Sequence, residues 1–165
     1  MNIFILKYFG IFFLIISFFS FFNIIYSYYF NLLNNLSNYI FTFIITLIIG
    51  LFLILFKNYK FEKINLFERI LIVLIGYIIL PIAISVPYYF NIDNLSLIDC
   101  YFEAISGFTS TGFTIFNDLK QLDQTLILWR SGSQWIGGLY FLFSILILID
   151  LFDENLKRSL TNYIS

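Results

Sequence analysis

Residues 96–114, SLIDCYFEAISGFTSTGFT, have the types and the spacing to bind a dehydrated cation. The second part of this stretch, residues 109–112, is short, rich in hydroxyl groups and ends in glycine. Backbone carbonyls in such a segment can replace part of the hydration shell of potassium, and glycine permits a positive φ angle. The pattern predicts a potassium-selective loop, for which the alternative is an ordinary hydroxyl-rich turn between two helices. The predicted loop residues are Thr109, Ser110, Thr111 and Gly112, with Ser110 and Thr111 as the predicted ion contacts.

A short helix is predicted immediately before this loop. Residues 95–107 would form a helix about 20 Å long, which is too short to cross a hydrocarbon core of about 30 Å. Ser96 at the N-cap and Asp99 three residues later match a capping box, and Gly107 is expected to end the helix in the left-handed conformation. The C-terminal end of a helix carries partial negative charge, so this arrangement favours a cation at the loop.

Four apolar stretches surround the short helix and predict membrane-spanning helices. The chain is 61% hydrophobic and 12% charged, a composition that excludes a water-soluble globule. The first stretch is longer than the apolar region of a cleaved signal peptide and lacks a small-residue cleavage site, so we expect a retained helix. The predicted spans are residues 3–30, 39–56, 70–90 and 125–149, followed by a charged tail at 150–165.

The rarer residue types exclude several kinds of chemistry. The sequence has no histidine and one cysteine, which excludes histidine-containing zinc sites, catalytic triads based on histidine and intramolecular disulfides. The net charge of −1 provides no basic field for nucleic acid. We expect no cofactor other than a transported ion, and no nucleic-acid partner.

The basic residues predict how the chain is oriented, because Lys and Arg gather on the cytoplasmic side of a membrane. Most of them lie in the loop 57–69 and in the tail, and the parity of the spans places Lys7 on the same side. We expect a multi-pass protein of the cytoplasmic (inner) membrane with a cytoplasmic N-terminus and the loop open to the outside. The acids on the outer side are either solvated by headgroups or form a mouth that concentrates cations. These acids are Asp93, Asp99, Glu103, Asp118 and Asp123.

The last span is unusually polar and rich in small residues. Arginine at membrane depth normally faces protein or water, so Arg130 is expected to pair with a carboxylate or to cap helix carbonyls. The alternative is an arginine that snorkels to the interface. Small residues allow another helix to approach closely. By helical spacing one face of this span carries Arg130, Ser133, Gln134, Gly137 and Gly138.

Three motifs together resemble the Trk/Ktr/HKT superfamily of potassium transporters, and most closely its bacterial TrkH branch. They are SVPYYF at 85–90, LSLIDCYFEAISGFTSTGFTIFNDLKQL at 95–122 and LWRSGSQWIGG at 128–138. The resemblance extends over about residues 66–149, and the two helices before it resemble the additional N-terminal pair of that branch.

The resulting expectation is an all-α membrane protein. Two N-terminal transmembrane helices (residues 1–60) precede one helix–re-entrant pore helix and filter loop–helix repeat (61–150) and a truncated cytoplasmic tail (151–165). The resemblance implies four such repeats, of which residues 110–112 contribute to the first filter strand, so a longer chain or partner chains are expected to supply the others. It also implies a homodimer and a cytosolic nucleotide-binding regulator of the TrkA type.

The function expected from these features is potassium uptake through a filter, without covalent chemistry and therefore not by an enzyme. Two alternatives remain open. The first is a non-conducting accessory or structural membrane subunit, or an inactive fragment. The second is a membrane-embedded enzyme that uses Asp99 and Glu103, which lie at i and i+4 on one helix face.

Overall fold

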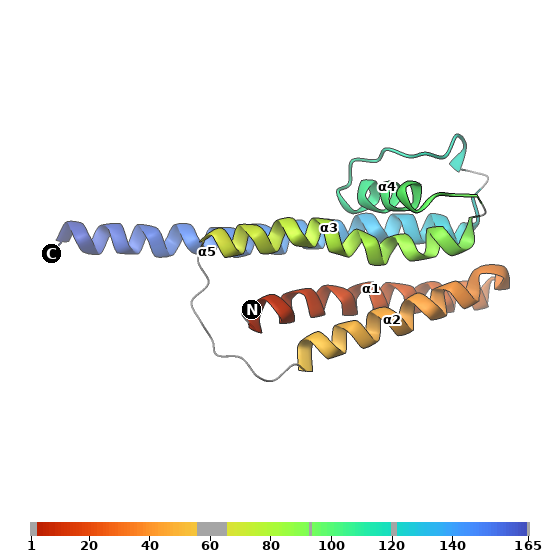
Figure 1. Ribbon diagram of the computed structural model, residues 1–165, viewed down its shortest axis with the longest axis horizontal. Coiled ribbons are helices and arrows are strands. Elements are labelled where there is room, and N and C mark those ends of the chain that lie inside the picture. The colour runs from red at the N-terminus through yellow and green to blue at the C-terminus, as the bar shows by residue number, and fades with distance from the viewer. Residues whose placement is uncertain (1–2, 56–65, 93, 120–121, 165) are drawn as a thin grey trace.

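The computed structural model describes residues 3–55, 66–92, 94–119 and 122–164, and the side chains within these ranges except at 3–5, 66 and 149–164 (Figure 1). Within these ranges the chain forms helices and loops, without a strand. The helices are α1 (Ile3–Tyr29), the short 3-10 helix η1 (Leu33–Asn35), α2 (Leu36–Leu55), α3 (Leu66–Asn91), α4 (Leu97–Phe108) and α5 (Gln124–Ile164). Lys57, Lys60, Lys63, Asp93 and Lys120 lie outside the described residues, as do the side chains of Lys157 and Arg158.

Four of the helices are long and apolar enough to cross a membrane, by length and composition. The candidate spans are residues 6–29, 33–55, 67–91 and 124–148. They confirm the predicted all-α membrane fold with four spans. Helix α4 has 12 residues and is about 18 Å long, so it is too short to span. Helix α5 continues past the predicted end of its span at residue 149, as far as Ile164.

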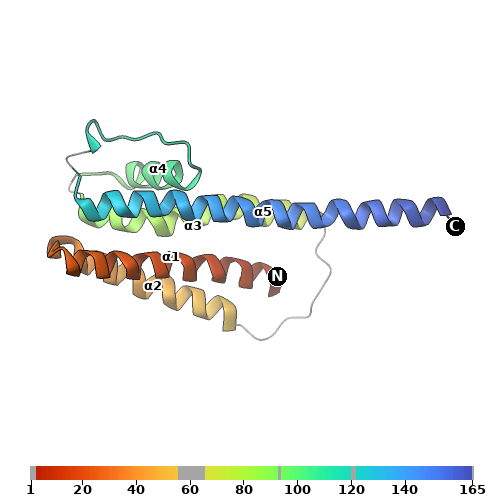
Figure 2. The ribbon, with the colours of Figure 1, turned by 180° about the vertical axis from the view of Figure 1, so that it is seen from behind.

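The helices form layers. The pair α1 and α2 lies on one side of the pair α3 and α5, and α4 with the loop that follows it lies on the other side (Figure 1). The view from behind shows the same order (Figure 2). The loop after α4 runs back beside that helix towards the start of α5, so both of its ends lie against the middle layer.

The antiparallel pair α1 and α2 packs closely because small residues face each other. A Cβ at Gly50 would lie 2.8 Å from Leu14 Cδ2 and 3.1 Å from the carbonyl oxygen of Gly10. Further along the pair, the Ser20 hydroxyl donates to the carbonyl oxygen of Tyr39 at 2.8 Å. In an apolar environment close packing and hydrogen bonds of this kind drive helix association.

The middle layer is held by aromatic side chains with polar ends. The Trp129 indole of α5 is buried and its Nε1 donates to the carbonyl oxygen of Ile84 on α3 at 3.0 Å. The buried Tyr140 hydroxyl donates to the carbonyl oxygen of Val73 at 2.9 Å, and a Cβ at Gly76 would overlap its ring. These contacts fix α5 against α3, and α5 in turn carries one wall of the candidate site.

We predict that Gly50→Val lowers the free energy of unfolding by about 1–3 kcal/mol, the usual cost of overpacking. The added atoms would push α2 away from Leu14 and Gly10. Thermal unfolding in detergent, followed by tryptophan fluorescence, measures the effect. Ile48→Val, at an exposed position of the same helix, is the control and should change stability little. Equal melting temperatures for both variants would contradict the close helix approach.

Candidate functional site

Helix α4 begins with the capping box expected from its sequence. The Ser96 hydroxyl accepts from the backbone N–H of Asp99 at 3.2 Å, and the Asp99 carboxylate accepts from the backbone N–H of Ser96 at 3.3 Å. Two otherwise unpaired amide donors at the helix start are thereby satisfied. The capping box fixes where α4 starts, and therefore where its other end meets the loop.

The end of α4 differs from the prediction for Gly107. The helix continues to Phe108 with Thr109 as C-cap, and positive φ angles occur later, at Ser110 (56°) and Gly112 (79°). Gly107 is buried within the helix, where a Cβ would overlap the Ser133 hydroxyl of α5. The prediction of a left-handed Gly107 was wrong, because this glycine is required by the close approach of α5 and not by a turn.

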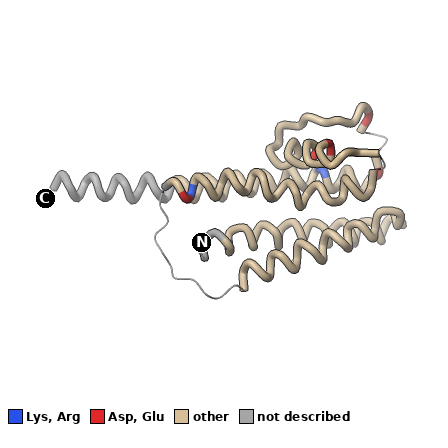
Figure 3. Tube along the Cα trace, in the orientation of Figure 1, with Lys and Arg blue, Asp and Glu red and all other residues tan. Residues whose placement is uncertain are grey.

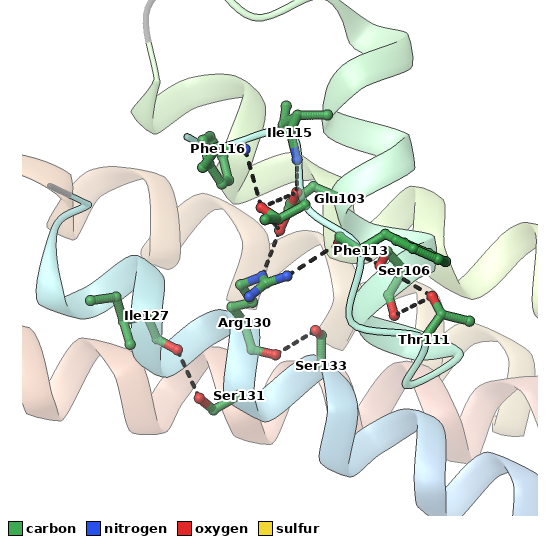
Figure 4. Close-up of polar contacts among 11 residues, drawn as sticks. Glu103, Ser106, Thr111, Phe113, Ile115, Phe116, Ile127, Arg130, Ser131 and Ser133 are labelled. Atoms are coloured by element: carbon green, nitrogen blue, oxygen red, sulfur yellow. Dashed lines mark hydrogen bonds and ion pairs between the residues drawn. The ribbon is translucent and has the colours of Figure 1, made fainter. Parts of the chain in front are cut away.

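An ion pair between α4 and α5 lies at the centre of the site (Figure 4). Glu103 is fully buried and its Oε1 lies 2.5 Å from Arg130 Nε. The same carboxylate accepts from the Thr114 hydroxyl at 3.0 Å and from the backbone N–H of Ile115 at 3.2 Å, while Arg130 Nη2 donates to the carbonyl oxygen of Phe113 at 3.2 Å. The pair therefore holds residues 113–115 of the loop as well as the two helices.

This ion pair confirms the expectation that Arg130 binds a carboxylate and does not snorkel. It also corrects both interpretations of Glu103 as an outer acid, whether solvated by headgroups or part of a mouth that concentrates cations, since the side chain has no exposed surface. A buried charge is tolerated only when paired and hydrogen-bonded. Removing one partner of such a pair costs about 3–5 kcal/mol because the other charge is left uncompensated.

A second set of hydrogen bonds ties the loop to the last turn of α4 (Figure 4). The buried Ser106 hydroxyl donates to the carbonyl oxygen of Phe113 at 2.6 Å, and its backbone carbonyl accepts from Thr111 N–H at 3.1 Å. The Thr109 hydroxyl donates to the carbonyl oxygen of Ile105 at 2.7 Å. Sequence reasoning did not identify Ser106, whose only signal was a hydroxyl in the final helical turn, five residues before Thr111.

The four predicted loop residues are exposed, but their polar groups are used unequally. The hydroxyls of Thr109 and Thr111 lie 3.3 Å apart, and both bond back to α4. By contrast, no hydrogen bond among the described residues uses a carbonyl oxygen of 109–112 as its acceptor. A Cβ at Gly112 would meet no atom within 4 Å, so glycine is favoured there by its φ angle of 79°. The main-chain oxygens of the tetrapeptide are thus available to a ligand.

The predicted face of α5 divides into two parts. Arg130, Ser133 and Gly137 contact α4, and a Cβ at Gly137 would overlap the carbonyl group of Phe108. A Cβ at Gly138 would meet no atom within 4 Å, and this residue lines a hollow of about 410 Å³ beside the start of the loop. Gln134 and Gly138 also line a neighbouring hollow beside the exposed Trp135.

The remaining acids do not form one cluster. Most of the described charged residues lie around α4, its loop and the start of α5 (Figure 3). Asp99 serves the capping box, and Asp123 accepts from the backbone N–H of Thr125 at 2.8 Å and from Asn35 Nδ2 at 3.0 Å. Asp99 and Glu103 have separate structural partners, which argues against the proposed acid–base pair. Asp118 is exposed on the loop.

Comparison with curated proteins finds transporters of cations and potassium. An uncharacterised cation transporter of Methanocaldococcus jannaschii is 39% identical over 54 residues, or 33% of this chain and 11% of that protein. The Trk system potassium uptake protein TrkG of Escherichia coli is 32% identical over 73 residues, or 44% and 15%. The corresponding protein TrkI of Halomonas elongata is 40% identical over 55 residues, or 33% and 11%.

These matches have a limited extent. The aligned residues make up 11–15% of the length of the three relatives. No family model matches the chain, and no solved structure matches it. The relatives are transport proteins rather than enzymes, in agreement with the expectation for this chain.

We predict that Glu103→Gln and Arg130→Met each lower the free energy of unfolding by about 3 kcal/mol, because each leaves a buried charge unpaired. The double variant should lose less than the sum of the two. A double-mutant cycle measured by denaturation in detergent gives the coupling, expected at about 1–3 kcal/mol. Asn117→Ala, on the exposed part of the loop, is the control. Additive effects would contradict a direct interaction.

We also predict opposite outcomes for two neighbouring glycines of α5. Gly137→Ala should lower the free energy of unfolding by about 1–3 kcal/mol, because the methyl group would overlap a backbone carbonyl of α4. Gly138→Ala should change it by less than about 0.5 kcal/mol, since the position is open. Thermal unfolding of the two variants in the same detergent checks the difference. Equal losses would show that α4 does not lie against Gly137.

Proposed function

We propose, from the premise that this chain is a Trk/TrkH-type protein, that it takes part in potassium uptake across the cytoplasmic membrane. The carbonyl oxygens of residues 109–112 would form part of the ion-selective filter. One observation carries the proposal: these oxygens accept no hydrogen bond from the described residues, while the Thr109 and Thr111 hydroxyls are bonded back to α4. A segment with bound side chains and available carbonyls suits the coordination of a dehydrated cation.

The direction of α4 supports a cation as the ligand. The helix ends at Phe108, directly before the tetrapeptide, so the partial negative charge of its C-terminal end lies beside the proposed ligand oxygens. Glu103 adds no free charge there because Arg130 neutralises it. The sign of the bound ion would therefore be set by the helix end and the carbonyls, not by an acidic side chain.

The rigidity of the loop is a condition for selectivity in this proposal. The ion pair fixes residues 113–115 after the tetrapeptide, and Ser106 fixes Thr111 and Phe113 from α4. In the snug-fit explanation of selectivity, the filter oxygens resist collapsing around an ion smaller than potassium. In this interpretation α4 is a re-entrant pore helix, and the short loop after it is a filter strand.

One such strand provides only part of a coordination shell, so we infer that further pore repeats surround the ion. They would belong to the same or to separate polypeptides and would cover the open side of the site. That side includes Gly138, beside the hollow of about 410 Å³ that Thr109 and Ser110 also line. Dimerisation of the complete subunit and a cytosolic nucleotide-binding regulator of the TrkA type are part of the same proposal.

We infer the orientation from the basic residues, with the N-terminus in the cytoplasm and the loop open to the outside. The positions of Lys7 and Arg69 near the starts of α1 and α3, away from the loop, support this inference.

Potassium flux into liposomes tests the function. The chain is reconstituted alone and together with polypeptides that supply the remaining repeats, and potassium-driven flux is recorded with a fluorescent indicator. Flux in the assembled form supports the proposal. Absence of flux in both preparations, with the chain correctly inserted, would favour the non-conducting accessory role.

We predict that Gly112→Ser in the conducting assembly reduces selectivity for potassium over sodium. A side chain at a φ of 79° strains the backbone by about 1 kcal/mol or more and would shift the neighbouring carbonyls. Flux ratios for the two ions in proteoliposomes measure the change. Asn117→Ser, on the same exposed loop but outside the tetrapeptide, should keep the original ratio. An unchanged ratio in Gly112→Ser at normal expression would refute a filter at this position.

A further inference from the structure

A second hollow lies at the opposite end of the bundle from the loop. It has a volume of about 430 Å³ and is formed by the beginning of α1, the beginning of α3 and residues 143–147 of α5. The charged residues that line it are both cations, Lys7 and Arg69. The rest of the lining is largely apolar and includes Ile11, Phe143 and Leu146, which are exposed on the outer surface of the bundle.

The two cations leave part of their hydrogen-bonding capacity unused. Arg69 Nη1 donates to the carbonyl oxygen of Ile147 at 3.2 Å, but its Nε is buried and has no hydrogen-bond partner. Lys7 is exposed, and no described residue forms a hydrogen bond or ion pair with it. A buried donor without a partner costs free energy. An anion placed between the two side chains would pair with both positive charges.

The depth of the hollow indicates where that anion would come from. Lys7 lies in the second turn of α1, which begins at Ile3, and Arg69 lies in the first turn of α3, which begins at Leu66. Both cations therefore lie where long apolar helices begin. Ends of spans lie at the level of lipid headgroups, where a phosphate group meets the acyl region. The hollow therefore has cations at headgroup depth and an apolar groove on its membrane side.

We propose that this hollow, which we name the Lys7–Arg69 groove, binds an anionic phospholipid such as phosphatidylglycerol. The phosphate would lie between Lys7 and Arg69, and one acyl chain would lie along Ile11, Phe143 and Leu146. Guanidinium groups match phosphate oxygens in geometry and charge. Basic pockets between transmembrane helices recognise anionic headgroups by the same chemistry. A zwitterionic lipid carries a cation of its own and lacks the net charge that both side chains favour.

Competition between lipids in nanodiscs tests the proposal. The chain is embedded in bilayers of equal parts phosphatidylglycerol and phosphatidylcholine with matched acyl chains, and the lipids retained are identified by native mass spectrometry. The wild type should retain phosphatidylglycerol preferentially. Lys7→Gln should reduce that preference about fivefold, the size expected for one cation near a headgroup. Lys7→Arg should restore it, because the positive charge is kept.

Further comparisons separate a lipid site from a simple anion site. Leu146→Ala should weaken retention of the lipid without changing the net charge, and excess inorganic phosphate should not displace it. Far-ultraviolet circular dichroism checks that each variant remains helical. Equal retention of the two lipids by the wild type, or equal preference in Lys7→Gln and the wild type, would overturn the proposal. Displacement by inorganic phosphate would overturn it in favour of a headgroup-only site.

Discussion

The candidate site depends on one constraint, which is that a carboxylate without any exposed surface must be neutralised where it lies. Glu103 meets this requirement through Arg130, Thr114 and the backbone of Ile115. These partners come from α5 and from the loop, so satisfying one charge fixes α4, α5 and the loop together. The cost of burying the pair is offset only while all of these bonds are present. The geometry of residues 109–112 is therefore linked to a network that lies outside the tetrapeptide.

Close packing provides the second condition for that network. Gly107 and Gly137 allow α4 and α5 to approach until a Cβ on either would overlap the other helix. This approach brings Arg130 within reach of Glu103, and the same principle joins α1 to α2 at Gly10 and Gly50. Helices in lipid gain little from burying apolar surface against each other. Small residues and interhelical polar bonds accordingly determine which faces meet.

The two ends of the bundle differ in electrostatics. At the loop end the buried acid is neutralised, and partial charges from α4 and from backbone carbonyls favour a cation. At the other end Lys7 and Arg69, near the starts of α1 and α3, line one hollow, which favours an anion. Between these ends the described parts of the spans are almost entirely uncharged. Among the described residues, charged side chains therefore lie towards the two ends of the bundle, apart from the Arg130–Glu103 pair within the protein.

Sequence alone determined the elements, because the signals for them are local. Runs of apolar residues predicted the four spans, the Ser96–Asp99 pattern predicted the capping box, and the glycine at 112 predicted a positive φ angle. Only the tertiary structure decided which side chains meet. It showed that Glu103 is buried in an ion pair with Arg130 and that Gly107 is needed for helix packing. It also showed that Ser106 links α4 to the loop. These contacts depend on how closely separate helices approach, and that distance is set by packing between elements far apart in the chain.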